Sequence, residues 1–253
     1  MTLPGIRPAL LEFAEPWLAR EPQLLLAGHF ATAGQARERF VATQVLLREL
    51  FESVLAVSDL RVAQARLGWW LDEAAHWASG TSRHPLAKAF SETEMATDLA
   101  VLVQQLLRWL EAPSASAMSE LAQRFIQFGE QLARISGVPA DIDHWGSASF
   151  CVALRMSLQA KAPLASLMPL DALARAAKTR ANWAQSEPGV LTRLLGEVGT
   201  TFPWPSRHAR TPEMRAMLAV ERRWLHLIAR GGDPLPVKVG VFDVFASWRA
   251  ARY

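Results

Sequence analysis

The sequence predicts an all-α protein, with about eight to ten helices in a single domain that spans residues 1–253. Every long apolar pattern repeats at three- and four-residue steps, which is the spacing of one helix face. No segment alternates apolar and polar residues as a half-buried strand does. The 14 glycines and 15 prolines cluster at the ends of these patterns, and a hydrophobic content of 51% is enough for a sizeable core. No internal repeat or low-complexity tract interrupts this arrangement.

Prolines divide the first 34 residues, so only short helical pieces such as Ala9–Ala14 are expected there. A long helix is predicted over Gln35–Val57. Its apolar residues extend round most of the helix surface, which is typical of a central helix. Asp59 is a suitable N-cap for the next helix, Leu60–Ser79, and Gly80 is placed to end it in the left-handed conformation.

After Pro85 the sequence predicts one short turn of helix, Leu86–Phe90. A capping box at Ser91–Glu94 then begins a helix that runs to Glu111. The following helix begins within Ala115–Ser119 and ends at Gly137. Further helices are predicted over His144–Lys161 with Asp141 or Asp143 as cap, Leu170–Trp183, Pro188–Val198, Pro212–Arg230 and Val241–Ala251.

Composition narrows the classes of function. The 27 basic and 24 acidic residues give a net charge of +3, and no basic run is dense enough for a nucleic-acid interface. The single cysteine, Cys151, excludes an internal disulfide and a cysteine-built zinc site, and its apolar neighbours predict an inert buried thiol. The N-terminal residues do not resemble a signal peptide, and no apolar run approaches the ~20 residues of a membrane span. We therefore expect a cytoplasmic protein, with peripheral membrane contact left open.

One motif points to a family. Arg66, Leu67, Trp69, Trp70 and Glu73 form a basic-Leu-x-W-W-x-x-E block, and the residues that follow it in the same motif are Gly80, His84 and Pro85. This combination resembles the squalene/phytoene synthase family, which acts on isoprenoid diphosphates in isoprenoid biosynthesis. The resemblance implies the isoprenoid-synthase helical fold, and it extends weakly over residues 24–175 and the C-terminal tail.

In that family two inward-facing helices each carry aspartates at i, i+4, which hold magnesium ions that bind the substrate diphosphate. Counting back from Trp69, the Arg of the family's first motif falls on Arg48. The paired acids fall on Phe51 and Glu52, and the last acid falls on Leu55. The resemblance therefore implies that two of the three acidic positions are apolar, and we expect Phe51 and Leu55 to fill part of the former metal cavity.

The second family motif resembles the segment from Gly146 to Ala160, where Leu154 and Arg155 are recognisable. Met156 and Ala160 stand at the positions of its acids. No Asp or Glu occurs between Asp143 and Asp171, so this segment supplies no carboxylate for a metal.

The predicted function is that of a squalene/phytoene synthase-like pseudoenzyme without catalytic residues, metal or other cofactor. It would act by binding a protein partner or an apolar isoprenoid ligand in an assembly or scaffold role. The alternative is an active prenyl transferase that uses Mg²⁺ on rearranged acids, Glu49, Glu52, Glu73 or Asp143. That alternative requires at least three of these carboxylates to converge on one cavity.

The candidate remnant pocket consists of nine residues: Arg48, Phe51, Glu52, Leu55, Trp69, Trp70, Glu73, His84 and Arg155. Each also has an ordinary structural interpretation. Arg48 and Glu52 have the i, i+4 spacing of a helical ion pair, and the tryptophans are suited to core packing. Glu73 is equally suited to a helix surface, and His84-Pro85 to a structured turn, because no acid partner for a catalytic base is evident.

A third possibility is a membrane-surface protein. The helix predicted to end at Arg230 carries arginines opposite apolar residues, and this pattern is typical of helices that lie in a lipid interface. The arginines are Arg215, Arg222, Arg223 and Arg230, and the apolar residues are Met217, Leu218, Trp224, Leu225 and Ile228.

Overall fold

A computed structural model describes residues 3–55, 57, 59–90, 93–112, 114–138, 142–160, 168–175, 189, 192, 196, 211–229 and 239–252. These residues form ten helices and no strand, which confirms the all-α prediction. The helices are α1 (Pro8–Arg20), α2 (Pro22–Phe30), α3 (Gln35–Leu55), α4 (Leu60–Ala78), α5 (Thr93–Glu111), α6 (Met118–Ser136), α7 (Ile142–Ala160), α8 (Leu170–Arg175), α10 (Pro212–Ala229) and α11 (Val241–Arg252).

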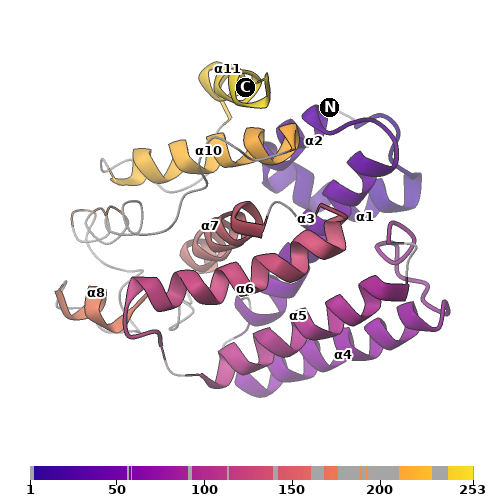
Figure 1. Cartoon of the computed structure of the whole chain (residues 1–253), viewed down its shortest axis with the longest axis horizontal. Helices are drawn as coiled ribbons and strands as arrows, with labels where there is room; N and C mark the ends of the chain where they lie inside the picture. The colour runs from indigo at the N-terminus through magenta and orange to yellow at the C-terminus, as the bar shows by residue number, and fades with distance from the viewer. Residues whose placement is uncertain are drawn as a thin grey trace.

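The centre of the molecule is made by α3 and α7, which pack against each other. Figure 1 shows α4 and α5 side by side below this pair, α10 and α11 above it, and α1 and α2 at the N-terminal end. Helix α3 packs against α1, α2, α4, α5, α6 and α7. That environment agrees with its apolar surface, since 16 of its residues are buried.

Two glycines let α6 and α7 approach closely. A Cβ added to Gly129 in α6 would lie 2.3 Å from the backbone nitrogen of Gly146 in α7. A Cβ added to Gly146 would lie 2.9 Å from the carbonyl oxygen of Phe125. Both distances are too short for a side chain, so the backbones themselves are in contact where these helices cross. Gly146 of the second motif therefore has a packing role in this structure.

The buried apolar side chains form one continuous cluster. Nine of the ten described helices contribute to it, and α11 is the described helix that does not. At about 25 cal/mol per Å² of buried apolar surface, such a cluster is the main source of folding free energy. None of the described helices is both long enough and apolar enough to cross a membrane.

Most predicted helix ends agree with the structure. Asp59 caps α4 by accepting a hydrogen bond of 2.8 Å from the Arg61 N–H. Gly80 and Gly137 have positive φ angles of 69° and 77°, as predicted for residues that end α4 and α6. Helix α3 ends at Leu55, two residues before the predicted end. Three predictions fall outside the fully described residues. They are the end of the helix predicted to reach Trp183, the helix Pro188–Val198, and the capping-box residues Ser91 and Glu92.

Two expectations were wrong. Residues 1–34 contain two full helices rather than short pieces, because Pro8 and Pro22 occupy the first helical positions, where proline is tolerated. Pro16 lies inside α1, which continues past it. The predicted helix Leu86–Phe90 is a series of turns, in which Ala89 N–H and Phe90 N–H each bond to the carbonyl oxygen three residues earlier.

Candidate functional site

Four charged side chains meet in the centre of the protein. Arg48 of α3 and Arg155 of α7 are fully buried. Their partners are Glu21, which lies between α1 and α2, and Glu221 of α10. Glu21 and Glu221 are 3% and 1% exposed, so two cations and two anions are held almost without contact with water. Three helices and the α1–α2 junction are thus joined at one point.

One oxygen of Glu21 joins the two arginines. Glu21 Oε2 accepts a hydrogen bond of 2.7 Å from Arg48 Nε and another from Arg48 Nη2. The same oxygen accepts from Arg155 Nη2 at 3.0 Å and from Gln23 Nε2 at 3.1 Å. Arg155 Nη1 donates at 2.5 Å to Glu221 Oε2. The order of the network is therefore Arg48, Glu21, Arg155, Glu221.

Neighbouring groups complete this buried network. Arg48 Nη1 donates to the Gln44 carbonyl oxygen at 2.8 Å and to Gln44 Oε1 at 2.7 Å. The Arg155 guanidinium lies 5.6 Å from the centre of the Trp224 ring. Four buried polar atoms of these residues form no hydrogen bond within the described chain: Gln23 Oε1, Gln44 Nε2, Arg155 Nε and Glu221 Oε1. The network is thus charge-balanced but retains unused hydrogen-bonding capacity.

The network shifts the pKa values of Glu21 and Arg155. Burial by itself would raise the pKa of Glu21, but the charges of Arg155 and Arg48 outweigh burial and hold that pKa below its ordinary value. Burial by itself would lower the pKa of Arg155, and Glu21 and Glu221 reverse this effect and raise it. Glu21 and Arg155 are therefore both charged at neutral pH. Burial, followed by the charge of Glu221, raises the pKa of Cys151 well above its ordinary value, so this thiol is inert.

Sequence reasoning identified both arginines but missed both glutamates. Glu221 stands on the apolar stripe of α10, between Leu218 and Trp224 at three-residue steps, and a carboxylate in that position predicts a buried cation as partner. No comparable signal identifies Glu21. It lies directly before Pro22 at the end of α1, and only the junction of α1 with α2 places it beside Arg48.

Apolar side chains occupy three described motif positions where the resembled family has acids, and Glu52 is an acid at another. Phe51 is fully buried and stacks on Phe128 of α6, with ring centres 5.5 Å apart and an interplanar angle of 21°. Leu55 and Met156 are also buried. Phe51, Leu55 and Met156 all belong to the main apolar cluster. The side chain of Ala160 lies outside the described part of the structure.

The acids proposed for the alternative mechanism lie in separate places. Glu49 accepts a hydrogen bond of 2.6 Å from Trp17 Nε1, and its pKa is raised, chiefly by burial. Glu52 is 3.6 Å from Arg20 Nη1 in a partly exposed ion pair, not paired with Arg48. Glu73 bonds to groups near the end of α4, and Asp143 is in the first turn of α7. In the part of the chain that the structure describes, no three His, Cys, Asp or Glu side chains gather as a metal-binding group.

The W-W-x-x-E block surrounds His84. Trp70 is buried, whereas Trp69 is 50% exposed. The His84 ring centre is 5.4 Å from that of Trp70, 5.9 Å from that of Trp69 and 4.9 Å from that of Phe13 in α1. Glu73 is buried and accepts from Trp77 Nε1 at 2.8 Å and from the Ser82 hydroxyl. The block thus connects α4 to α1 through the turn after Gly80.

His84 also has a hydrogen bond that stabilises this turn. Its Nδ1 accepts from the Leu86 N–H at 3.2 Å, which requires Nδ1 to be unprotonated. Burial lowers the pKa of His84, and the charge of Glu73 opposes that shift only in part. The neutral ring is therefore favoured at neutral pH. These contacts place His84 in a turn rather than beside a group from which it would take a proton.

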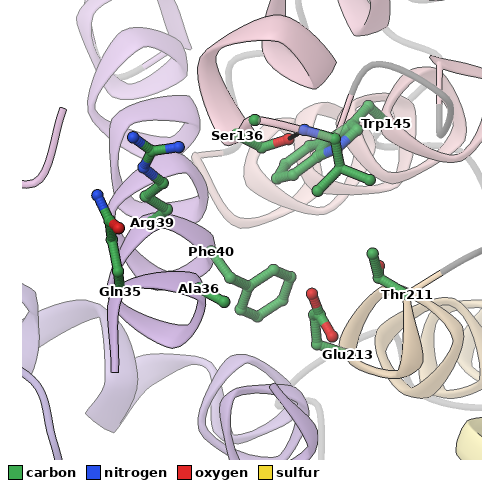
Figure 2. A pocket seen from close by; sticks show the side chains of 10 residues that line it. Gln35, Ala36, Arg39, Phe40, Ser136, Trp145, Thr211 and Glu213 are labelled. Atoms are coloured by element: carbon green, nitrogen blue, oxygen red, sulfur yellow. Dashed lines mark hydrogen bonds between the residues drawn. The ribbon is translucent and has the colours of Figure 1, made fainter. Parts of the chain in front are cut away.

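A pocket of about 200 Å³ lies elsewhere, between the N-terminal ends of α3 and α10 and the C-terminal end of α6 (Figure 2). Phe40 and Trp145 provide its aromatic wall, with ring centres 6.4 Å apart, and Glu213 faces it from α10. Its lining residues are Gln35, Ala36, Arg39, Phe40, Ser136, Gly137, Val138, Trp145, Thr211 and Glu213. No residue of the predicted remnant pocket lines this one.

The apolar face of α10 is covered by the rest of the protein. Met217, Leu218, Trp224 and Leu225, which the sequence placed on a membrane-facing surface, are buried and belong to the main apolar cluster. The side chains of Ile228 and Arg230 lie outside the described residues. The apolar side of α10 is therefore directed to the core.

These observations define an all-α protein with a charge-balanced ionic network between its two central helices. Comparison of the chain with protein-family models, curated proteins and solved structures gives no match. The resemblance to squalene/phytoene synthases consequently depends on the sequence motifs alone.

Proposed function

We propose that this protein is a squalene/phytoene synthase-like pseudoenzyme, a helical binding protein in an assembly or scaffold role that does not transfer prenyl groups. One observation carries this proposal. The two motif arginines, Arg48 and Arg155, are both neutralised by carboxylates of the protein itself. A diphosphate would have to displace Glu21 and Glu221 to reach them, and that would leave two buried anions without their partners.

The packing around Phe51 supports the same proposal. Catalysis by ionisation of a prenyl diphosphate needs metal ions that neutralise the leaving group. Phe51 and Leu55 instead present hydrocarbon at motif positions on α3, and Phe51 is stacked on Phe128. Replacing this contact with hydrated ions would require the side chains of α3 and α6 to separate.

The pocket beside Trp145 favours a protein partner over an isoprenoid ligand. Its volume of about 200 Å³ is below the ~300–1,000 Å³ of pockets that enclose ligands of drug size. Polar groups such as Glu213 also line it, and these are unsuitable neighbours for a prenyl chain. We therefore place the binding activity on the protein surface rather than in this pocket.

The test is turnover. Purified protein is incubated with Mg²⁺ and either farnesyl or geranylgeranyl diphosphate, and released pyrophosphate is measured against a protein-free blank. We expect no release above the blank. Sustained magnesium-dependent release would overturn the proposal and support the alternative, a prenyl transferase that uses rearranged acids.

A binding measurement tests the neutralised arginines separately. Inorganic pyrophosphate with Mg²⁺ is added to wild-type protein and to the variant Glu21→Gln, and the thermal midpoint is recorded. We expect no shift for the wild type and stabilisation of the variant, in which both arginines lose their shared carboxylate. A shift in the wild-type protein contradicts the proposal whether or not the variant folds.

A further inference from the structure

Helix α11 buries its polar side and exposes its apolar side. Asp243 and Ser247 are buried, whereas Phe242, Phe245 and Trp248 are 76%, 60% and 42% exposed. Val244 adds a further side chain that is 47% exposed. The orientation is the reverse of that expected for a surface helix, whose apolar stripe faces the core. We call Phe242, Val244, Phe245 and Trp248 the aromatic face of α11.

Polar contacts to α10 hold α11 in this orientation. Arg223 Nη1 donates at 2.7 Å to Asp243 Oδ1, and the Ser247 hydroxyl donates at 3.2 Å to the Ala216 carbonyl oxygen. Arg215 Nη2 donates at 2.8 Å to the carbonyl oxygen of Ala251. Rotating α11 to bury its aromatic face would break all three contacts. The exposed face is therefore a consequence of specific bonds and not of loose attachment.

The aromatic face also carries positive charge. Arg249 and Arg252 are exposed on α11, and the Arg252 guanidinium lies 4.2 Å from the centre of the Trp248 ring. Asp243, the one acid in the sequence of this helix, is buried and paired with Arg223. The surface offered by α11 is consequently apolar and cationic together, and Figure 1 shows the helix at the outer edge of the molecule beyond α10.

We propose that α11 is an interfacial helix that docks the protein on an anionic lipid surface. Phenylalanine and tryptophan side chains suit the boundary between headgroups and acyl chains, and arginines beside them suit lipid phosphates. The free energy that drives α11 from water into the lipid interface comes from burying its exposed apolar area, which no described residue covers. This inference does not depend on the proposed loss of prenyl transfer, because it concerns a different part of the molecule.

Charge argues against a second copy of the chain as the occupant. A symmetric pair brings the same patch of both subunits together, so the cationic patch that holds Arg249 and Arg252 would face a second cationic patch without an exposed acid from α11. Such like-charge contacts are unfavourable. An anionic membrane instead offers many phosphates to both arginines, which is the complementary arrangement.

The experiment is flotation of the full chain with phosphatidylcholine vesicles, with and without phosphatidylserine. We expect binding to the anionic vesicles that weakens as salt is added. Phe245→Ser with Trp248→Ser should weaken binding about tenfold or more, since both apolar anchors are lost. Arg249→Gln and Arg252→Gln should each weaken binding to anionic vesicles by about fivefold.

The matched control is Leu60→Ser with Val62→Ser on α4, where the side chains are 47% and 42% exposed. This variant should bind as the wild type does. A fluorescence measurement gives a second readout, because a blue shift on adding vesicles should diminish in Trp248→Phe. If the double variant fails to fold, Phe242→Ser at the most exposed position replaces it.

Three results would overturn the proposal. The first is absence of wild-type binding to anionic vesicles. The second is binding that neither the α11 aromatic nor the arginine variants weaken. The third is a wild-type dimer in light scattering that becomes monomeric in Phe245→Ser/Trp248→Ser without any vesicle binding, which would assign the face to contact between copies of the chain.

Discussion

The centre of the protein and helix α11 depart from the usual arrangement in opposite directions. In the centre, Arg48 and Arg155 are buried among apolar side chains. On α11, Phe242 and Phe245 are exposed and the buried contacts are made by Asp243 and Ser247. In both regions the position of the hydrogen-bonding or ionic partner determines which polar side chain is buried. The polarity of a side chain alone does not predict whether it is buried. The centre thus holds a buried ionic network, whereas α11 leaves its apolar side exposed.

The largest expected effect is at the centre. Arg155→Met should lower the free energy of unfolding by about 3–5 kcal/mol, because Glu221 would be left buried without a cation. Urea denaturation measures the change. The double variant Arg155→Met/Glu221→Gln should recover part of the loss, since Arg48 and Glu21 remain as a neutral pair. A loss of less than about 1 kcal/mol for the single variant would show that the buried network contributes little.

The second-largest expected effect on stability is at the crossing of α6 and α7, which supports the centre of the protein. Gly129→Ala should destabilise the protein by about 1–3 kcal/mol or more, because its Cβ would collide with the Gly146 backbone nitrogen. Gly68→Ala in α4 is the matched control, since nothing lies within 4 Å of its added Cβ. The control should be stabilising by up to about 1 kcal/mol through helix propensity. Equal thermal midpoints for the two variants would contradict the close crossing.

The third-largest expected effect on stability appears only at acid pH. The pKa of Glu21 is lower in the folded protein than its ordinary value of 4.5, so the unfolded chain binds this proton more readily. Its stabilising contribution is complete above about pH 4.5 and is lost as the pH falls through the folded pKa. Urea denaturation between pH 6 and pH 3 should show this loss, and Glu21→Gln should flatten the dependence.

The surface carboxylate of Glu120 also contributes to the loss of stability at acid pH, and it serves as the control for that experiment. The backbone N–H of Ser116, followed by the Ser116 hydroxyl and Arg124, lowers the pKa of Glu120 to about 2. Glu120→Gln removes this surface contribution alone. The prediction for Glu21 is contradicted if Glu120→Gln flattens the pH dependence as much as Glu21→Gln does.

The smallest expected effect on stability is at α11. Asp243→Ala removes a partly exposed ion pair with Arg223, which is worth about 0.2–1 kcal/mol. Hydrogen exchange should accelerate in residues 241–252 and stay unchanged in α3 and α7. The comparison variant is Asp59→Ala, which removes the cap of α4 and should accelerate exchange only at that helix end. Faster exchange across the whole protein in Asp243→Ala would show that α11 is coupled to the core.

The sequence predicted the fold class and most helices because their signals are local. The spacing of apolar residues, the Asp59 cap and the glycines at 80 and 137 each act within a few residues of chain. Only short helical pieces were predicted where the first two helices lie, because proline was treated as a helix breaker, although Pro8 and Pro22 stand at first positions that accept it. The arrangement as an isoprenoid synthase remains a prediction.

The candidate site was predictable only in part. Arg48 and Arg155 were singled out by motif positions on two helices, and the structure brings them to the same carboxylate. The rings of Trp69 and Trp70 contact the ring of His84, and His84 contacts Phe13 of α1 rather than the arginine network. The predicted remnant pocket is thus divided between two places in the fold.

By itself the sequence determined most of the segments that become helices, and the resemblance implies that most of the family's metal-binding acids are absent from the matched positions. Only the tertiary structure decided that Glu21 and Glu221 would neutralise Arg48 and Arg155, because those partners are 27 and 66 residues away along the chain. It also decided which side of α11 meets solvent. Helical periodicity shows which residues share a face, but the neighbouring helix determines which face is buried.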